Sequence, residues 1–354
     1  MSEDLQRLRA EIDALDEEIL ARIVRRAQLA QAIGQHKAGN IYRPEREAQV
    51  LQRLLKLDHA PVPDAALGVI FREIVSTCRA QEALPKVAYL GPEGTFSQAA
   101  VIKHFGHAVE SVLALSMDEV FRTVETGNAD FGVVPVENSS EGAVGRTLDL
   151  ALDSPLKVCG EVLLPIHQCL MRAQPGLEGI VRVYSHAQSL GQCHEWLNRH
   201  LPHAERVRVS SNAEGARLAA EDENTAAVAG EVAAERYGLE VLARNIEDEP
   251  DNTTRFLVIG RSDAAPSGRD KTSLAMAARN QPGAMVALLE PFARHGVSMT
   301  RFESRPSRKA NWEYVFYVDI EGHRDDAPVA KSLAEIGSRA ALLRILGSYP
   351  AAIV

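Results

Sequence analysis

Residues 86–100, KVAYLGPEGTFSQAA, set the pattern from which the whole 354-residue chain can be divided. The run KVAYLG has the composition of a strand, GPEG is a turn, and Thr95 and Ser97 are favourable residues for opening a helix. The same order of strand, polar turn and helix-like stretch recurs at FGVVPVEN (131–138), RVYSH (182–186), RVRVSS (206–211) and AAVAG (226–230). This alternation predicts an α/β domain with a mostly parallel sheet and helices on both faces.

This α/β domain is expected to cover residues 86–262 and to have two lobes. The apolar run KVCGEVLLPIHQCLMRA (157–173) is too long for one ordinary strand, so we expect it to cross from the first lobe to the second. The second lobe then covers about residues 167–245. The acidic segment NIEDEPDNTTRF (245–256) marks the return of the chain to the first lobe.

Upstream of Pro85, residues 1–84 have the pattern of an all-helical domain. In residues 5–37, apolar residues recur every three or four positions without a proline, which predicts one amphipathic helix about 50 Å long. Two shorter helices are expected from about Pro44 to Leu57 and from about Asp64 to Glu82. A helix of this length is longer than a small domain is wide, so we expect it to pack against a second subunit in a homodimer or higher homo-oligomer.

Downstream, the segment SDAAPSGRD (262–270) has the composition of a linker. The order strand, helix, strand, strand, helix, short strand follows in residues 272–354. This βαββαβ order predicts a small ferredoxin-like α+β domain.

Composition limits the classes of function. The chain is 45% hydrophobic and lacks an apolar stretch of about 20 residues or a signal peptide, so we expect a cytoplasmic protein without a membrane segment. Basic and acidic residues number 12 and 13 in residues 1–85, 17 and 27 in 86–271, and 10 and 8 in 272–354. This balance argues against nucleic acid as a partner. The four cysteines form no metal-ligand or disulfide pattern, so neither a metal nor a cofactor is expected.

Several polar residues of the helical domain recur at helical spacing. Arg26 and Lys37 are about three helical turns apart and share a face, whereas Arg9 lies about 25 Å before Arg26 along the same helix. One small ligand cannot contact both arginines of one helix, so Arg9 would serve a neighbouring subunit. Thr77 and Gln81 are four residues apart and point the same way. Spacing alone favours the interpretation of these residues as solvated charges on a dimerisation coil.

The segments LRAEIDALDEEIL (8–20), VRRAQLAQAIGQHK (24–37), YRPERE (42–47) and STCRAQEAL (76–84) resemble the all-helical chorismate mutase family. That family is an intertwined dimer whose pericyclic reaction needs no nucleophile, metal or proton transfer. The resemblance implies that Arg26 and the partner subunit's Arg9 hold the carboxylates of chorismate, while Lys37 and Gln81 stabilise the ether oxygen. It further implies binding roles for four more residues, namely Arg43 (through its backbone), Arg46, Glu47 and Thr77.

In the α/β domain, polar residues follow three expected strands. They are Thr95 after the first, Glu137, Asn138 and Ser139 after FGVVPV, and Ser185, His186 and Gln188 after RVY. Ligands of open α/β folds bind at the carboxyl ends of strands, so these loops are candidates for an anion-binding cleft. Ordinary helix capping explains the serines and threonines about equally well.

The segment DNTTRF (251–256) is the sharper signal. If a strand begins near Arg255, then Thr254 and Phe256 face one side of the sheet and Arg255 the other. The motifs GPEGTFSQAA, VPVENSSEG, SHAQ and NTTRF resemble, in this order, the prephenate dehydratases, which have a two-lobed fold like type-II periplasmic binding proteins. The resemblance implies that Thr254 helps hydroxide leave from prephenate, with Arg255 and Phe256 in the same motif. Glu137 is a second candidate for general acid, and the residues expected to position the substrate are Asn138, Ser139, Ser185, Gln188 and Thr95.

Residues 272–350 resemble the ACT domain, an amino-acid sensor. Gly283, Ala284 and Met285 open a helix where a carboxylate can bind, and Glu303, Ser304 and Arg305 offer a carboxylate and a cation. The resemblance implies L-phenylalanine as an inhibitor bound between two ACT domains; a purely structural dimerisation domain is the alternative.

The three resemblances together predict a bifunctional enzyme that converts chorismate to prephenate and prephenate to phenylpyruvate under feedback control. Two other interpretations stay open. One is a dehydratase that uses arogenate, and the other is a non-catalytic cytoplasmic regulator that binds an amino acid.

Overall fold

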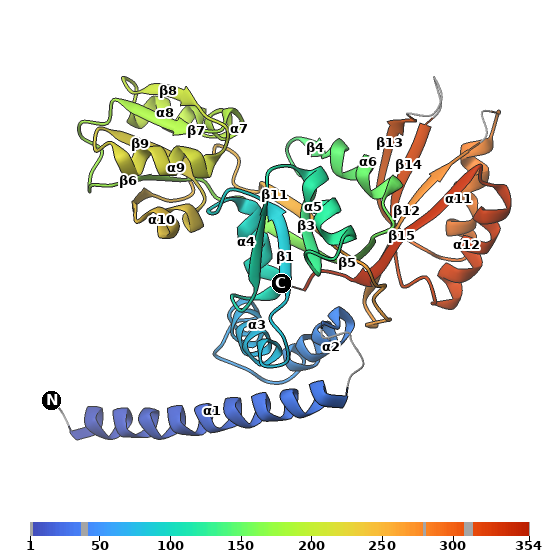
Figure 1. The fold of residues 1–354 in the computed structure, drawn as a ribbon, viewed down its shortest axis with the longest axis horizontal. Helices are drawn as coiled ribbons and strands as arrows, with labels where there is room; N and C mark the ends of the chain where they lie inside the picture. Colours follow the sequence, from blue (N-terminus) through green and yellow to red (C-terminus); the bar gives the residue numbers. More distant parts are fainter. Residues whose placement is uncertain (1–2, 37–41, 279–280, 308–313, 354) are drawn as a thin grey trace.

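The computed structural model describes residues 3–36, 42–278, 281–307 and 314–353. Its chain forms a helical module, a two-lobed α/β domain and a C-terminal α/β module, in that order (Figure 1). The helical module consists of α1 (Glu3–His36), α2 (Pro44–Leu55) and α3 (Asp64–Ala80), which confirms the three expected helices. Pro44 at the first position of α2 fits the helix start because the nitrogen of proline needs no hydrogen-bond partner there.

Helix α1 is a long rod that contacts the rest of the chain mainly through α3 (Figure 1). Nine large apolar side chains of α1 are between 39% and 62% exposed, including Ile12, Leu15 and Ile19. By contrast, the segment before α2 is anchored in the α/β domain, because the Tyr42 ring is buried against Phe105 and Phe131. The helical module is therefore docked at α2 and α3 but leaves the apolar stripe of α1 without cover in a single chain.

The first lobe is built on a sheet with the order β2-β1-β3-β11-β5, and β4 (Gly142–Ala143) pairs with β3. The strands β1 (Lys86–Leu90), β2 (Glu110–Ala114) and β3 (Phe131–Asn138) run parallel. Strand β11 (Thr253–Gly260) enters between β3 and β5 (Lys157–Pro165) and is antiparallel to both. The prediction of a mostly parallel sheet holds for β1, β2, β3 and β5, which run in the same direction, but β11 comes back from the second lobe in the opposite direction and makes the sheet mixed. The helices of this lobe are α4 (Phe96–Phe105), α5 (Met117–Glu125) and α6 (Gly145–Asp153).

The second lobe has a five-stranded mixed sheet with the order β10-β6-β9-β7-β8. As predicted, the long apolar run splits into β5 in the first sheet and β6 (Cys169–Arg172) in the second. The chain returns between β10 (Glu240–Ala243) and β11, which is the other expected crossing. The remaining elements are β7 (Arg182–Ser185), α7 (Ala187–Gln192), α8 (His194–His200), β8 (Glu205–Arg208), α9 (Asn212–Glu221), β9 (Thr225–Ala229) and α10 (Glu231–Tyr237).

The C-terminal module is a four-stranded antiparallel sheet with the order β13-β14-β12-β15. Its elements are β12 (Asp270–Ala277), α11 (Ala284–Arg294), β13 (Met299–Pro306), β14 (Tyr314–Glu321), α12 (Ala327–Arg339) and β15 (Leu342–Pro350). This confirms the ferredoxin-like order, although β15 has nine residues and is not the short strand expected.

The C-terminal module and the first lobe share one hydrophobic core, which contains Val158 of β5 together with Leu346 and Tyr349 of β15. At Gly347 of β15 the two backbones approach so closely that a Cβ atom would overlap the backbone of Val158. Glycine is required there for the two sheets to pack at this spacing.

Candidate functional site

A hydrogen-bonded cluster of polar side chains lies where β3 ends and β11 begins. The antiparallel register places Thr254 opposite Asn138. The Asn138 amide nitrogen lies 2.9 Å from Thr254 Oγ1 and 2.7 Å from Asn252 Oδ1. All three residues are at least 91% buried, and Asn138 Oδ1 accepts backbone N–H bonds from Ser140 and Glu141. The cluster therefore holds the Thr254 hydroxyl in one orientation in a largely dry environment.

Ser139 joins this cluster from the same strand end. The Thr253 backbone N–H donates to Ser139 Oγ at 2.9 Å, and Ser139 Oγ lies 3.4 Å from Asn252 Oδ1. The structure thus brings together three residues expected from sequence, Asn138, Ser139 and Thr254. Asn252 was not among the expected site residues, although its position two residues before Thr254 in DNTTRF is the signal that could have found it.

The Arg255 side chain is engaged elsewhere, at the contact between the first lobe and the C-terminal module. Its Nε donates to Glu161 of β5 at 2.8 Å, its Nη1 to Asp319 of β14, and its Nη2 to the hydroxyl of Tyr349 of β15 at 2.9 Å. Arg255 is 91% buried. Neighbouring residues of a strand point to opposite faces, so Thr254 and Arg255 take part in two different polar clusters.

Two further residues complete the network around Arg255. Ser273 of β12 donates to Asp319 and bonds the Tyr349 hydroxyl at 2.6 Å, and Lys271 pairs with Glu161 at 2.8 Å. Burial lowers the pKa of Arg255, but Tyr349, Asp319 and Glu161 more than offset this and raise it overall. Burial also raises the pKa of Tyr349, which stays neutral. The guanidinium of Arg255 and the hydroxyl of Tyr349 therefore both keep their protons at neutral pH.

Strand β13 makes two more ion pairs with the first lobe. Arg301 Nε lies 2.9 Å from Glu137 Oε2, and Arg305 Nε lies 3.3 Å from Asp149 of α6. Strand alternation places Glu303 on the same face as these two arginines and Ser304 on the opposite, exposed face. Glu137, expected as a general acid, is thus paired with Arg301 and does not join the Thr254 cluster.

The other expected dehydratase residues lie apart from the Thr254 cluster. Ser185 is buried in the second lobe and donates to the Val228 carbonyl at 2.6 Å, and Gln188 lies in the first turn of α7. Thr95 is the N-cap of α4, and Phe256 is buried in the core of the first lobe. Among the described residues, no hydrogen bond joins these four side chains to Asn138 or Thr254.

The expected mutase residues are spread over three helices. Arg26 is half-buried on α1, Arg46 is exposed on α2, and Thr77 and Gln81 are exposed at the end of α3. Arg9 is exposed on α1, 17 residues before Arg26, and Arg43 is the exposed N-cap of α2. Lys37 lies outside the described residues. Within the described residues, one chain therefore presents these side chains on separate helices.

Glu47 has a strong partner that the sequence did not indicate. Its carboxylate lies 2.7 Å from Arg79 Nη1, and Arg79 also donates to the Phe105 carbonyl at 2.6 Å. Arg79 is 96% buried and lies over the Tyr42 and Phe105 rings. This pair ties α2 and α3 to α4 of the first lobe.

The expected sensor residues lie at the start of α11 and on β13. Gly283 has a left-handed φ of 76° and is exposed, while Ala284 and Met285 begin the helix half-buried. The N-cap residue Gly283 has no side chain to cap this helix, and the Ala284 N–H donates to the Gln281 carbonyl at 3.2 Å. Glu303 and Ser304 lie on β13, which is an edge strand of its sheet.

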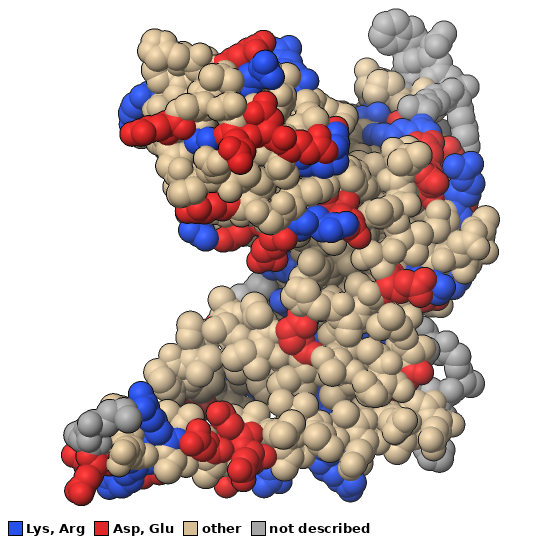
Figure 2. Space-filling view, turned by 60° about the vertical axis from the view of Figure 1, so that its left-hand side comes forward, with Lys and Arg blue, Asp and Glu red and all other residues tan. Residues whose placement is uncertain are grey.

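Three observations concern the molecule beyond these sites. No helix in the described ranges is both long and apolar enough to cross a membrane. On the face that Figure 2 shows, acidic and basic side chains are interspersed over the second lobe, without an extended basic patch. The four cysteines are buried and unpaired.

Comparison with known proteins supports this division of the chain. Family models match residues 8–83 (chorismate mutase type II), 87–264 (prephenate dehydratase) and 272–338 (ACT domain). A bifunctional chorismate mutase/prephenate dehydratase of Neisseria gonorrhoeae is 54% identical and covers 97% of this chain and 96% of its own length. The Escherichia coli protein of the same name is 37% identical over 97% of this chain and 95% of its own.

A solved structure gives the same assignment for the part downstream of the helices. Prephenate dehydratase from Arthrobacter aurescens, solved in complex with L-Phe, aligns with a TM-score of 0.69 and 37% identity. The alignment covers 75% of this chain and 90% of the Arthrobacter chain. With three family models in order and relatives that match along almost the entire length, this chain belongs to the family of bifunctional chorismate mutase/prephenate dehydratases.

Proposed function

We propose that the mutase reaction takes place at a site shared by two subunits of a cytoplasmic homodimer. The observation that supports the dimer is the uncovered apolar stripe of α1, because a stripe of this length is stable in water only when another surface covers it. Arg26, Lys37, Arg46, Glu47, Thr77 and Gln81 come from one subunit in this proposal, and the partner subunit's Arg9 completes the site. Arg43 contributes its backbone.

The chemistry at this site is charge stabilisation. Chorismate carries two carboxylates, and its rearrangement breaks an ether bond whose oxygen gains negative charge. Preorganised arginines lower the energy of that transition state without an acid, a base or a cofactor. The Glu47–Arg79 pair holds the α2 end of the site against the first lobe, so that Glu47 is oriented before substrate arrives.

For the dehydratase reaction we propose that Thr254 is the central residue. Asn138 orients the Thr254 hydroxyl, whose proton then bonds the leaving hydroxide of prephenate as carbon dioxide departs. Ser139 and Asn252 fix the same strand end. Thr95, Ser185 and Gln188 bind the carboxylates and the ketone of prephenate, which requires the second lobe to close towards the first. Phe256 supports strand β11 from within the core.

We further propose that L-phenylalanine binds the C-terminal module and inhibits dehydration. Its carboxylate binds the start of α11 at Gly283, Ala284 and Met285, and its ammonium group binds near Glu303 and Ser304. Arg305 is a positioning residue in this proposal, since it pairs with Asp149 of the first lobe. Ligand binding beside β13 changes the Arg301–Glu137 and Arg305–Asp149 pairs, which end on the strand and helix next to the dehydratase cluster.

In this proposal, Arg255 is the residue that links the C-terminal module most directly to Thr254. It follows Thr254 directly in β11, and three strands of the two domains hold its guanidinium. A shift of the C-terminal sheet would therefore move the backbone that carries Thr254. In this proposal Arg255 positions the catalytic hydroxyl and does not contact prephenate itself.

The experiment that tests these functions gives chorismate to the purified full chain and follows chorismate, prephenate and phenylpyruvate over time. We expect phenylpyruvate to form from chorismate alone, and L-phenylalanine to suppress it. Accumulation of prephenate would contradict the dehydratase assignment, and unchanged chorismate would contradict the mutase assignment. A parallel assay with arogenate decides whether the dehydratase site also takes the amino acid analogue of prephenate.

A further inference from the structure

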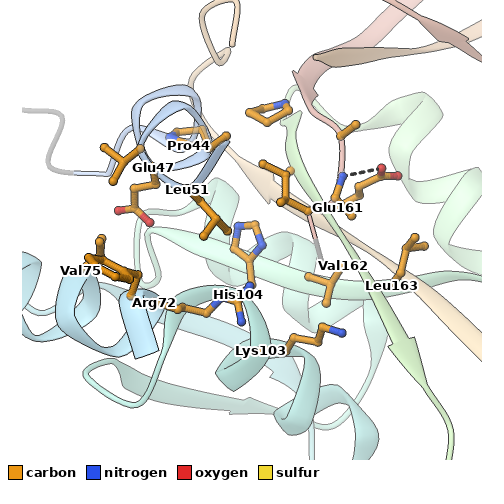
Figure 3. A pocket seen from close by; sticks show the side chains of 18 of the residues that line it. Pro44, Glu47, Leu51, Arg72, Val75, Lys103, His104, Glu161, Val162 and Leu163 are labelled. Atoms are coloured by element: carbon orange, nitrogen blue, oxygen red, sulfur yellow. Dashed lines mark hydrogen bonds between the residues drawn. The ribbon is translucent and has the colours of Figure 1, made fainter. Parts of the chain in front are cut away.

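A cavity of about 390 Å³ lies where the helical module, the first lobe and the segment after β15 meet (Figure 3). Side chains of α2 and α3 form one side, α4 and β5 the other, and residues 350–353 close it. This volume is in the range of small-molecule sites. Of the residues assigned above to the three sites, only Glu47 lines it, so the cavity adjoins the mutase site and contains none of the assigned dehydratase or sensor residues.

The two acidic residues that line the cavity are already neutralised. Glu47 is paired with Arg79, which is not part of the lining. Glu161 is paired with Arg255 and Lys271, and it also accepts the backbone N–H of Ala352 at 2.9 Å. Each of the two carboxylates therefore already has a cationic partner that is not Arg72 or Lys103.

Two cations that line the cavity have no such partner. Arg72 of α3 and Lys103 of α4 are both half-buried, and within the described ranges neither makes an ion pair or a side-chain hydrogen bond. Burial lowers the pKa of each side chain. The charges of Glu73 and Glu47 offset this only in part at Arg72, and the positive charge of Arg72 lowers the pKa of Lys103 further. An anion between them would remove both the desolvation cost and the mutual repulsion.

The rest of the lining is mainly apolar. Leu51, Val75, Val162 and Leu163 surround the space, and Figure 3 shows them beside Arg72 and Lys103. His104 adds no charge, because burial and the neighbouring arginines lower its pKa to about 3 and its Nε2 is bonded to the Tyr42 hydroxyl. The site therefore combines a cationic end with an apolar body.

We propose that this cavity binds a small organic carboxylate with an apolar or aromatic body, its carboxylate held between Arg72 and Lys103. The body lies against Leu51, Val75 and Val162. Because residues of all three modules line the cavity, an occupant links the modules physically. One of the lining residues, Glu161, is paired directly with Arg255. This proposal does not depend on the roles assigned above to the catalytic residues.

The test measures binding of 3-phenylpropanoate to the full chain by calorimetry, with 3-phenylpropan-1-ol as the neutral probe of similar shape. The variants are Lys103→Gln, Lys103→Arg and, as a matched control, Lys56→Gln, which replaces an exposed lysine after α2. We expect Lys103→Gln to weaken binding of the acid at one site by about tenfold or more, Lys103→Arg to retain it, and Lys56→Gln to leave it unchanged. The alcohol should bind at least about tenfold more weakly than the acid.

Equal affinity for the acid in Lys103→Gln and the wild type would overturn the proposal, whichever other site then takes the acid. Equal affinity for the acid and the alcohol would overturn it as well. Arg72→Gln provides a second variant from the other side of the cavity, with the same expected loss. Mutase and dehydratase rates of each variant, measured without the probe, show that the chain is folded and that the known sites are intact.

Discussion

The helical module and the body formed by the α/β domain and the C-terminal module assemble their sites in different ways. Within one chain, the dehydratase cluster is already complete in its hydrogen bonds, and Asn138, Asn252 and Thr254 are buried. Most of the expected mutase residues that the structure describes are instead exposed, namely Arg9, Arg43, Arg46, Thr77 and Gln81, and α1 keeps its apolar stripe uncovered. Under the proposed dimer, the difference teaches that one chain contains a site made by its own tertiary packing and contributes to another site that two subunits share.

The largest effect is expected from single substitutions in the mutase site and from mixing them. Arg9→Ala and Arg26→Ala should each lower the mutase rate by about 10³-fold, because each removes a charge from the transition state. If the partner subunit's Arg9 completes the site, mixing the two variants after unfolding restores one intact site in half of the dimers, or about a quarter of the wild-type activity. The measurement is the mutase rate before and after mixing.

An unchanged rate after mixing would mean that both arginines act within one chain, and the contrast with the dehydratase site would disappear. Arg7→Ala on the exposed start of α1 is the control, with no expected change in rate.

The next largest effect is expected at the proposed dehydratase site, whose polar cluster lies within one chain. Thr254→Ala should lower the dehydratase rate by about 10²-fold and leave the mutase rate unchanged, because only the leaving hydroxide loses its hydrogen-bond donor. Thr254→Ser should restore much of the rate, and Thr253→Ala is the neighbouring control. Equal dehydratase rates for Thr254→Ala and wild type would contradict the proposed role.

A substitution at the contact between the two sheets should affect stability. Gly347→Ala places a Cβ on the backbone of Val158, so we expect the free energy of unfolding to fall by about 2–3 kcal/mol. Gly191→Ala is the control, since a Cβ there meets no atom within 4 Å. Denaturant unfolding followed by circular dichroism measures both. Similar stability of the two variants would show that the sheets can separate at little cost.

A smaller effect should appear in regulation. Tyr349→Phe removes the hydroxyl that accepts from Arg255 and bonds Ser273, so the C-terminal sheet loses part of its hold on β11. We expect about fivefold more L-phenylalanine to be needed for half-inhibition of dehydration, with the mutase rate unchanged. Tyr314→Phe, at an exposed tyrosine of the same sheet, is the control. An inhibition curve identical to that of the wild type would remove Arg255 from the regulatory route.

The last effect, which vanishes at neutral pH, is a pH dependence at the contact between the helical module and the body. Burial lowers the pKa of His104 from 6.5 to about 3, so between these values the unfolded chain binds a proton that the folded chain does not. Stability is therefore lost as the pH falls below 6.5, by at most about 1.4 kcal/mol per pH unit. His104→Gln should flatten the slope of unfolding free energy against pH, and His203→Gln, at an exposed position, should not.

The sequence predicted the elements better than their partners. Apolar periodicity located α1, α2 and α3 to within a few residues at each end, because a long uninterrupted helix leaves a strong pattern. The direction of β11 could not be predicted, because a strand that returns from another lobe has the same local pattern in either direction.

For the candidate site, too, the sequence predicted the residues better than their partners. The Thr254 cluster could be located by resemblance, and the alternation of strand residues correctly separated Arg255 from it. The partners of Arg255 could not be predicted, because Asp319 and Tyr349 lie 64 and 94 positions away and meet it only when two domains pack. For the same reason the pairing of Glu137 with Arg301 was not visible in the sequence.

The insertion of β11 between β3 and β5 also sets an order of events during synthesis. Strand β5 ends at Pro165, but the strand that must lie beside it begins only at Thr253, after the whole second lobe. Until then β3 and β5 have unpaired edges, which are prone to wrong pairing. The first lobe of a nascent chain must therefore wait for the second lobe to emerge. The strand that then completes its sheet, β11, is also the strand that carries Thr254.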